Sequence, residues 1–282
     1  MTITITVRAL AALATTLLLA SCGGGGGGDS SSVVSMSASN ARFGNTTVIT
    51  VNGKSLLSSP ITVTIEGPCD NLARAGTGSE DTQQFTCSMN GIGSLRAHAL
   101  QDGGGVLGTL SFDVPTPQVS ITTGQGSFVL ELDPVAAPIT VKNFLAYVNA
   151  SFYRNVIFHR VIAGLVIQSG AYNAGPTLKP ATFQAIKLES ANGLKNLRGT
   201  ITAARGDAAD SATAGFWINL ADNPQFDRVD DSNPGYAVFG RVISGIDKVD
   251  AIGAVPIRPD LLTGLGAVPV TDVIITAISQ QR

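Results

Sequence analysis

One short segment of the chain carries an arginine and a glutamine at a spacing that could place the two side chains together in a functional site. Residues 158–170 read FHRVIAGLVIQSG, so two apolar runs are separated by Ala163-Gly164. Apolar runs joined by a glycine-containing turn predict a β-hairpin, which would hold Arg160 and Gln168 rigidly on one face of a sheet. A fixed guanidinium beside an amide could stabilise charge that develops on an uncharged substrate during a reaction.

The two histidines of the chain carry a weaker signal. His159 could act as a general base, but we expect it to point into the fold as a hydrogen-bonded core residue. His98 lies in a different predicted domain, so no histidine-based metal site is expected. For Arg160 the alternative to a chemical role is a structural ion pair. We predict neither a metal nor a cofactor.

The elements that must position this hairpin lie in residues 118–282, after the boundary Pro115-Thr116-Pro117. Apolar residues at helical spacing predict a helix over 139–148 with Thr140 as its N-cap, and 245–252 reads as a second, short helix. Residues 171–198 are predicted to form a long polar loop. Strands are predicted at 128–132, 199–204, 216–220, 236–240 and 270–278. The result is a mainly β fold, an antiparallel barrel with one helix at each open end.

Residues 33–115 read as a separate domain of short strands. Alternating apolar runs lie at 46–51, 61–65, 85–89, 95–100 and 110–114, and Asn52-Gly53 is a strong turn signal. Regular strands without a helical period predict a small antiparallel β-sandwich. It resembles bacterial immunoglobulin-like modules. Because no motif there carries chemistry, we expect a spacer or interaction module.

The N-terminus predicts export and lipid attachment. Arg8 precedes an apolar run, 9–20, that is too short to span a bilayer, which is typical of a secretory signal over residues 1–21. The string LASC at 19–22 resembles a bacterial lipobox, in which Cys22 is acylated; the alternative is an ordinary signal peptide. The lipid would anchor the protein to a bacterial membrane. Because Gly23 is not aspartate, the resemblance favours the outer membrane, facing the periplasm.

The remaining cysteines predict a disulfide. Residues 22–32 are rich in glycine and serine, which predicts a flexible tether. With Cys22 assigned to lipid, Cys69 and Cys87 remain, in a compartment that permits disulfides. We expect a bridge between these two residues; two buried free thiols are the alternative.

The net charge of the chain is small. Removing residues 1–21 removes Arg8 and no acid, which changes the formal net charge from −2 to −3. This balance argues against a nucleic-acid partner, which requires a basic face. Charged residues make up 13% of the chain, against about 25% in average soluble proteins. Small residues and threonine take their place, which suits an exported, β-rich chain.

Residues 118–282 resemble the bacterial cyclophilins, a family of peptidyl-prolyl cis-trans isomerases. The matching strings, in order, are APITVKNF at 137–144, FY at 152–153, the segment 158–170, NGL at 192–194, RGTI at 198–201 and GYAVFG at 235–240. The resemblance implies an eight-stranded barrel with two helices, no cofactor, and proline-containing exported polypeptides as substrates. We expect a monomer.

The resemblance also implies a site. Arg160 would be the central catalytic residue, with Gln168 beside it to position the substrate backbone. The proline pocket would be lined by Leu165, Val166, Trp217, Phe226 and Tyr236. Ala204 and Arg205 fall where the family binds the residue before the proline through backbone groups.

The chain departs from the family pattern around that pocket. Ala163 replaces a usual proline, LV at 165–166 replaces Phe-Met, and GFW at 215–217 replaces Gln-Phe-Phe. These changes favour an alternative function, a cyclophilin-like module or chaperone that binds Pro-containing segments with little or no turnover. Arg160 and Gln168 favour an active isomerase.

Overall fold

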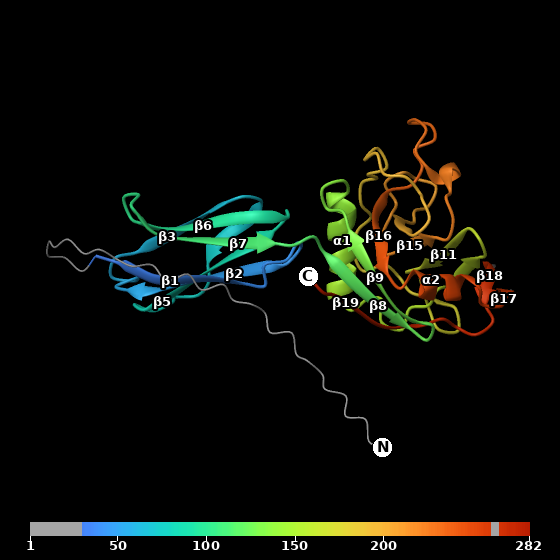
Figure 1. The fold of residues 1–282 in the computed structure, drawn as a ribbon, viewed down its shortest axis with the longest axis horizontal. Coiled ribbons are helices and arrows are strands. Elements are labelled where there is room, and N and C mark those ends of the chain that lie inside the picture. Colours follow the sequence, from blue (N-terminus) through green and yellow to red (C-terminus); the bar gives the residue numbers. More distant parts are fainter. Residues whose placement is uncertain (1–29, 261–264) are drawn as a thin grey trace, which may run out of the picture. The chain divides into compact units, whose positions relative to one another are not determined.

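The computed structural model describes residues 30–260 and 265–282, and it is mainly β (Figure 1). The predicted signal sequence and Cys22 lie outside the described residues. The chain divides into two compact units, the first ending at Val114 and the second beginning at Pro115. In the part of the chain that the structure describes, no helix has the length and hydropathy of a membrane span.

The first unit consists of two antiparallel sheets, which Figure 1 shows as two layers. One sheet has the strand order β1 (Ser32–Ser39), β2 (Thr46–Lys54), β5 (Thr82–Met89) and β4 (Cys69–Arg74). The other has the order β3 (Ile61–Glu66), β6 (Gly93–Gln101) and β7 (Val106–Val114). Alternate residues are buried in the strands that the apolar alternation predicted, for example Ile49 and Val51 of β2.

The predicted turn at Asn52-Gly53 is wrong, because both residues lie inside β2. Gly53 pairs with Val33 of β1, and a Cβ at Gly53 would collide with the carbonyl oxygen of Ser32. The glycine therefore permits the close approach of two strands. The sequence prediction also lacked β1 and β4. β4 is an edge strand with mostly exposed side chains, so its sequence has no apolar alternation to detect.

A disulfide joins Cys69 of β4 to Cys87 of β5, as predicted, with the two Cα atoms 5.7 Å apart. The alternative of two free thiols is not observed. Because β4 and β5 are hydrogen-bonded neighbours, the bond fastens the edge strand to the interior of its sheet.

The second unit is a curled, eight-stranded antiparallel sheet with two helices, which confirms the predicted fold class. The strands in their order across the sheet are β10 (Arg160–Ile162), β11 (Val166–Ser169), β15 (Phe216–Asn219), β14 (Thr200–Ala203), β16 (Val238–Ser244), β9 (Gly126–Leu132), β8 (Gln118–Thr123) and β19 (Ile275–Gln280). Two small hairpins pair β12 (Tyr172–Asn173) with β13 (Thr177–Leu178) and β17 (Ile257–Asp260) with β18 (Leu265–Pro269). The predicted last strand, 270–278, is wrong at its start, because the observed strand begins at Ile275, after β18.

The two predicted helices are present as α1 (Pro138–Asn149) and α2 (Ile246–Gly253). The predicted N-cap is wrong, because Thr140 lies inside α1 and is buried. The carboxylate of Glu189 accepts hydrogen bonds from the backbone N–H groups of Ile139 at 3.0 Å and Thr140 at 2.7 Å, and from the Thr140 hydroxyl at 2.7 Å. A negative charge also suits the positive end of a helix dipole. A residue distant in sequence thus fixes the start of α1.

Aromatic rings fill the interior of the second unit. Phe144 of α1 packs against Tyr153, Phe216 and Phe239, with ring centroids 5.4, 5.5 and 5.4 Å away. Phe216 belongs to β15 and Phe239 to β16. One helix residue therefore joins the segment before the hairpin to two strands of the sheet.

Candidate active site

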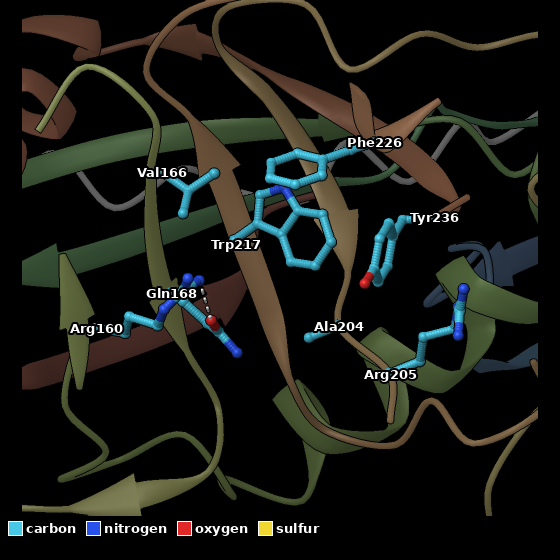
Figure 2. A pocket seen from close by; sticks show the side chains of 8 residues that line it. All are labelled: Arg160, Val166, Gln168, Ala204, Arg205, Trp217, Phe226 and Tyr236. Carbon is cyan, nitrogen blue, oxygen red and sulfur yellow. Dashed lines mark hydrogen bonds between the residues drawn. The ribbon is translucent and has the colours of Figure 1, made fainter. Parts of the chain in front are cut away.

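The predicted hairpin is present: β10 pairs with β11, and Arg160 lies directly opposite Gln168. Gly164, at the turn between the strands, has a φ of 69°, which residues with a side chain rarely adopt. Directly opposed residues project to the same face of a sheet. Nη1 of Arg160 donates to Oε1 of Gln168 at 3.2 Å (Figure 2). The pair therefore holds the guanidinium in a fixed place.

A cavity of about 250 Å³ opens beside this pair (Figure 2). It is lined by Arg160, Val166, Gln168, Ala204, Arg205, Trp217, Phe226 and Tyr236. The structure thus brings together all the predicted catalytic and substrate-binding residues except Leu165. They come from β10, β11, β15 and the segments that follow β14 and precede β16.

Three aromatic rings form one wall of the cavity. Trp217 comes from β15, Phe226 from the 3₁₀-helix Pro224–Phe226, and Tyr236 from the segment before β16. The centroid of the Trp217 ring lies 5.4 Å from that of Phe226 and 4.8 Å from that of Tyr236. Trp217 is only 6% exposed. The wall therefore offers a rigid apolar surface to a small ring.

Arg205 supports the far side of this wall. Its guanidinium carbon lies 4.7 Å from the centroid of the Tyr236 ring, a cation–π contact, and its Nε donates to the Gly235 carbonyl at 3.1 Å. Arg205 thus supports the wall through its side chain, and its predicted backbone contact with a peptide stays a prediction. The N–H of Ala204 donates to the Gly215 carbonyl at 2.9 Å, so a backbone bond from Ala204 to a peptide would use its carbonyl.

Leu165 does not line the cavity, although its neighbour Val166 does. Leu165 is a half-buried residue of the hairpin turn. Its carbonyl accepts hydrogen bonds from the N–H of Leu220 at 2.8 Å and from Nδ2 of Asn223 at 3.0 Å, which tie the turn to the end of β15.

A second cavity, of about 400 Å³, adjoins the first. The two share Gln168, Ala204 and Arg205. Lys179 also lines the second cavity; burial lowers its pKa, and its Nζ lies 4.6 Å from the centroid of the Phe152 ring. Sequence reasoning missed Lys179 because it lies in a polar loop without a motif.

Gly215 affects the space beside Ala204. A Cβ at Gly215 would approach the Cβ of Ala204 to 3.1 Å, so the glycine keeps the space between them open.

His159, next to Arg160, is 3% exposed. Burial lowers its pKa to about 4; a hydrogen bond to the Ile157 backbone acts in the opposite direction, and the Arg160 charge lowers the pKa further. The His159 ring packs on Tyr172, with centroids 4.8 Å apart, and its Nδ1 has no hydrogen-bond partner among the described residues. His159 is therefore a neutral core residue at pH 7. The predicted core position is confirmed, whereas the predicted hydrogen bonding is not met at Nδ1 within the described part of the chain.

The charged groups that line the two cavities are cations. Arg160 and Arg205 line the first cavity, and Lys179 lines the second. Neither lining includes an acidic side chain. Within residues 30–260 and 265–282, no group of three or more His, Cys, Asp or Glu side chains is placed to hold a metal ion. The arrangement can stabilise electron density that develops next to an apolar pocket.

Comparison with known proteins identifies the family. The family model described as cyclophilin type peptidyl-prolyl cis-trans isomerase/CLD matches residues 118–280. The chain belongs to this family. Peptidyl-prolyl cis-trans isomerase A of Dickeya dadantii (strain 3937) is 47% identical over 137 residues, which are 49% of this chain and 71% of that protein. Peptidyl-prolyl cis-trans isomerase B of Escherichia coli (strain K12) is 47% identical over 139 residues, 49% of this chain and 84% of that protein.

A solved structure of the same family also matches. The cyclophilin type isomerase of Cryptosporidium parvum has 24% sequence identity and a TM-score of 0.48, covering 59% of this chain and 98% of its own. The family model and the two curated relatives, rather than this structure, show that the chain is a peptidyl-prolyl cis-trans isomerase that binds proline-containing peptides, as predicted. The family match includes all eight strands of the curled sheet, whereas the first unit lies outside it.

Proposed function

We propose that Arg160 stabilises the twisted prolyl amide while the aromatic wall holds the proline ring. Resonance gives the amide bond a rotation barrier of ~18–20 kcal/mol. Rotation through the perpendicular state localises the lone pair on the prolyl nitrogen, and a guanidinium beside it stabilises that state more than the planar ground state. The observation that supports this role is the position of Arg160 at an apolar cavity, with its charge held 3.2 Å from Gln168 Oε1.

Gln168 has a complementary role in this proposal. Its Oε1 accepts from Arg160, which fixes the amide plane, so its Nε2 can donate to a carbonyl of the substrate backbone. Arginine suits the central position better than lysine, since its planar fork stays charged and keeps its direction. The aromatic wall grips the ring, and the peptide before the proline can then rotate.

Exchange rates of an Xaa-Pro peptide test the role of Arg160. Arg160→Ala is expected to lower kcat/KM about 10²–10³-fold, the usual effect of removing a preorganised group that stabilises a transition state. Arg241→Ala is the matched control, because Arg241 is an exposed arginine of the same unit, paired with Glu131 at 3.3 Å, and its loss should leave the rate unchanged. Equal rates for wild type and Arg160→Ala would overturn the catalytic role and favour the alternative, a Pro-peptide-binding module or chaperone with little or no turnover.

We further propose that the isomerase assists the folding of exported proteins, held as a monomer by lipid on Cys22 at the outer membrane, facing the periplasm. The LASC string at 19–22 supports export, and so does the bond between Cys69 and Cys87, since disulfides persist in oxidising compartments. The first unit would act as an immunoglobulin-like spacer or interaction module.

Cell fractionation tests the lipid anchor. The Cys22→Ser variant is expected in the soluble fraction; a variant that stays with the membranes would contradict the anchor.

A further inference from the structure

A buried amide lies directly behind the aromatic wall. Asn219 follows Trp217 by two positions on β15, so the two side chains project to the same face of the sheet. Asn219 is 0% exposed, and the indole Nε1 of Trp217 donates to its Oδ1 at 3.3 Å. Because an indole N–H can only donate, the oxygen of the amide must be the atom that faces it.

The same oxygen of Asn219 accepts a second hydrogen bond, from Nδ2 of Asn223 at 2.8 Å. Asn223 directly precedes the 3₁₀-helix that carries Phe226. Its Nδ2 also donates to the carbonyl of Leu165, at the turn of the hairpin that carries Arg160, at 3.0 Å. A single acceptor atom therefore links the indole, the loop of a second wall ring and the catalytic hairpin.

The nitrogen of the same amide is also occupied. Nδ2 of Asn219 donates to Oγ1 of Thr200 at 2.9 Å and lies 3.2 Å from Oγ1 of Thr202. The hydroxyl of Thr202 donates to Oδ1 of Asn196 at 2.8 Å, and the backbone N–H of Asn196 donates to Asp227, directly after the 3₁₀-helix, at 2.8 Å. Buried polar networks in which every member is satisfied hold one geometry. The wall is thus backed by a rigid set of hydrogen bonds rather than by apolar packing alone.

We propose that Asn219 is a positioning residue of the isomerase, whose side-chain oxygen holds Trp217 and Asn223 together and so sets the shape of the proline pocket. A phenylalanine at position 217 would have no N–H, so the tryptophan is what makes this oxygen part of the wall. The inference rests on the proposal that the cavity receives the proline ring. Asn219 itself does not line the cavity, and acts through the two residues that it holds.

The expected effect falls on substrate binding. The wall contacts the proline ring in the ground state and in the transition state alike, so loosening it should raise KM and leave kcat nearly unchanged. Losing two neutral hydrogen bonds behind the wall corresponds to an increase in KM of about three- to tenfold. Trp217 is the single tryptophan of the chain, so tryptophan fluorescence, excited selectively over the four tyrosines, reports on this wall alone.

The test compares Asn219→Ala with Thr200→Val in the full chain. Thr200→Val removes a hydrogen bond from the nitrogen of the same amide and leaves both bonds to its oxygen in place. We expect Asn219→Ala to raise KM for an Xaa-Pro peptide, to shift the emission to longer wavelength and to increase quenching by acrylamide. Thr200→Val is expected to keep the wild-type KM and emission, even if it is less stable. Equal KM and emission for the two variants would overturn the proposal.

A second variant covers the case in which Asn219→Ala does not fold. Asn223→Ala removes a donor to the same oxygen and lies in the loop after β15. It should raise KM and acrylamide quenching in the same direction; a wild-type KM together with wild-type quenching would refute the positioning role. A wild-type protein without isomerase activity would refute the proposed function instead, while the fluorescence comparison would still decide whether Asn219 holds the indole.

Discussion

Both units are built from antiparallel strands, but the connections between their strands differ. In the first unit consecutive strands follow one another closely: residues 90–92 join β5 to β6, which lie in different sheets, and 102–105 join β6 to β7. In the second unit, residues 204–215 join β14 to β15, and 220–237 join β15 to β16. Four residues that line the first cavity, Ala204, Arg205, Phe226 and Tyr236, lie in these long connections. Long connections on a rigid sheet are where binding sites are built.

The units also differ in what holds their peripheral segments. The first unit fastens its edge strand covalently, through Cys69 and Cys87. The second unit fastens its long connections with hydrogen bonds from buried side chains, such as Tyr153 Oη to the Ala214 carbonyl at 2.8 Å. The first unit should therefore respond to reduction, and the second to changes in protonation and in single polar groups.

Loss of the disulfide is the sharpest test of this difference. The Cys69→Ser/Cys87→Ser double variant opens a loop with a sequence separation of 18 residues, which should lower the free energy of unfolding of the first unit by about 3 kcal/mol. Hydrogen exchange of the amides in β5 should then accelerate, while exchange in β15 should not change. Isomerase activity towards an Xaa-Pro peptide should stay at the wild-type rate, because the cavity belongs to the second unit.

Reduction of the wild-type protein is the control for the serine substitutions, and it should give the same exchange pattern. If the reduced protein or the double variant lost isomerase activity in proportion to its stability, the two units would not be independent. That result would contradict the claim that the disulfide stabilises the first unit without affecting the second.

Acid should act on the second unit. The folded state lowers the pKa of His159 from 6.5 to about 4, mainly through burial, so the folded state binds the proton less readily than the unfolded state. The stabilisation is complete above pH 6.5 and is lost as the pH falls towards 4; at pH 5 the loss amounts to about 2 kcal/mol. Denaturant unfolding of the second unit at pH 7.5 and pH 5, followed by the fluorescence of Trp217, measures it.

The two histidines make the control possible, since each unit has one. Nε2 of His98 lies 3.3 Å from Oε1 of Glu66 in the first unit, whereas among the described residues no acidic group lies within ion-pair distance of His159. His159→Gln should remove most of the difference between pH 7.5 and pH 5, and His98→Gln should leave it in place. A His159→Gln protein with the full pH dependence would show that another group titrates.

Much of the fold could be predicted because burial imposes a pattern on the sequence. β6 was predicted because Leu95, Ala97 and Ala99 alternate with polar residues and point into the core. β4 escaped prediction, since an edge strand needs no buried side chains. The capping role of Glu189 also escaped it, because its partners in α1 lie 49 and 50 positions away and no local pattern encodes such a contact.

The site could be predicted only in part, for a similar reason. Arg160 and Gln168 are paired across one short hairpin, so their proximity follows from local sequence. Phe226 and Tyr236 reach the same cavity through connections whose course depends on tertiary contacts, and only the family resemblance indicated them. The buried amide of Asn219 carried no sequence signal, since an asparagine at the end of a strand usually indicates a turn.

The smallest expected effect concerns the cap of α1. Glu189→Gln keeps an oxygen that can accept from Ile139 or Thr140 but removes the charge at the helix N-terminus, so the second unit should lose about 1 kcal/mol of unfolding free energy. Glu131→Gln is the matched control, because Glu131 pairs with the exposed Arg241, and such surface pairs contribute little. Equal losses in both variants would mean that Glu189 acts as an ordinary surface charge. A loss confined to Glu189→Gln, measured by denaturant unfolding, would show that a hydrogen-bonded contact between distant segments does for the second unit what the disulfide does for the first.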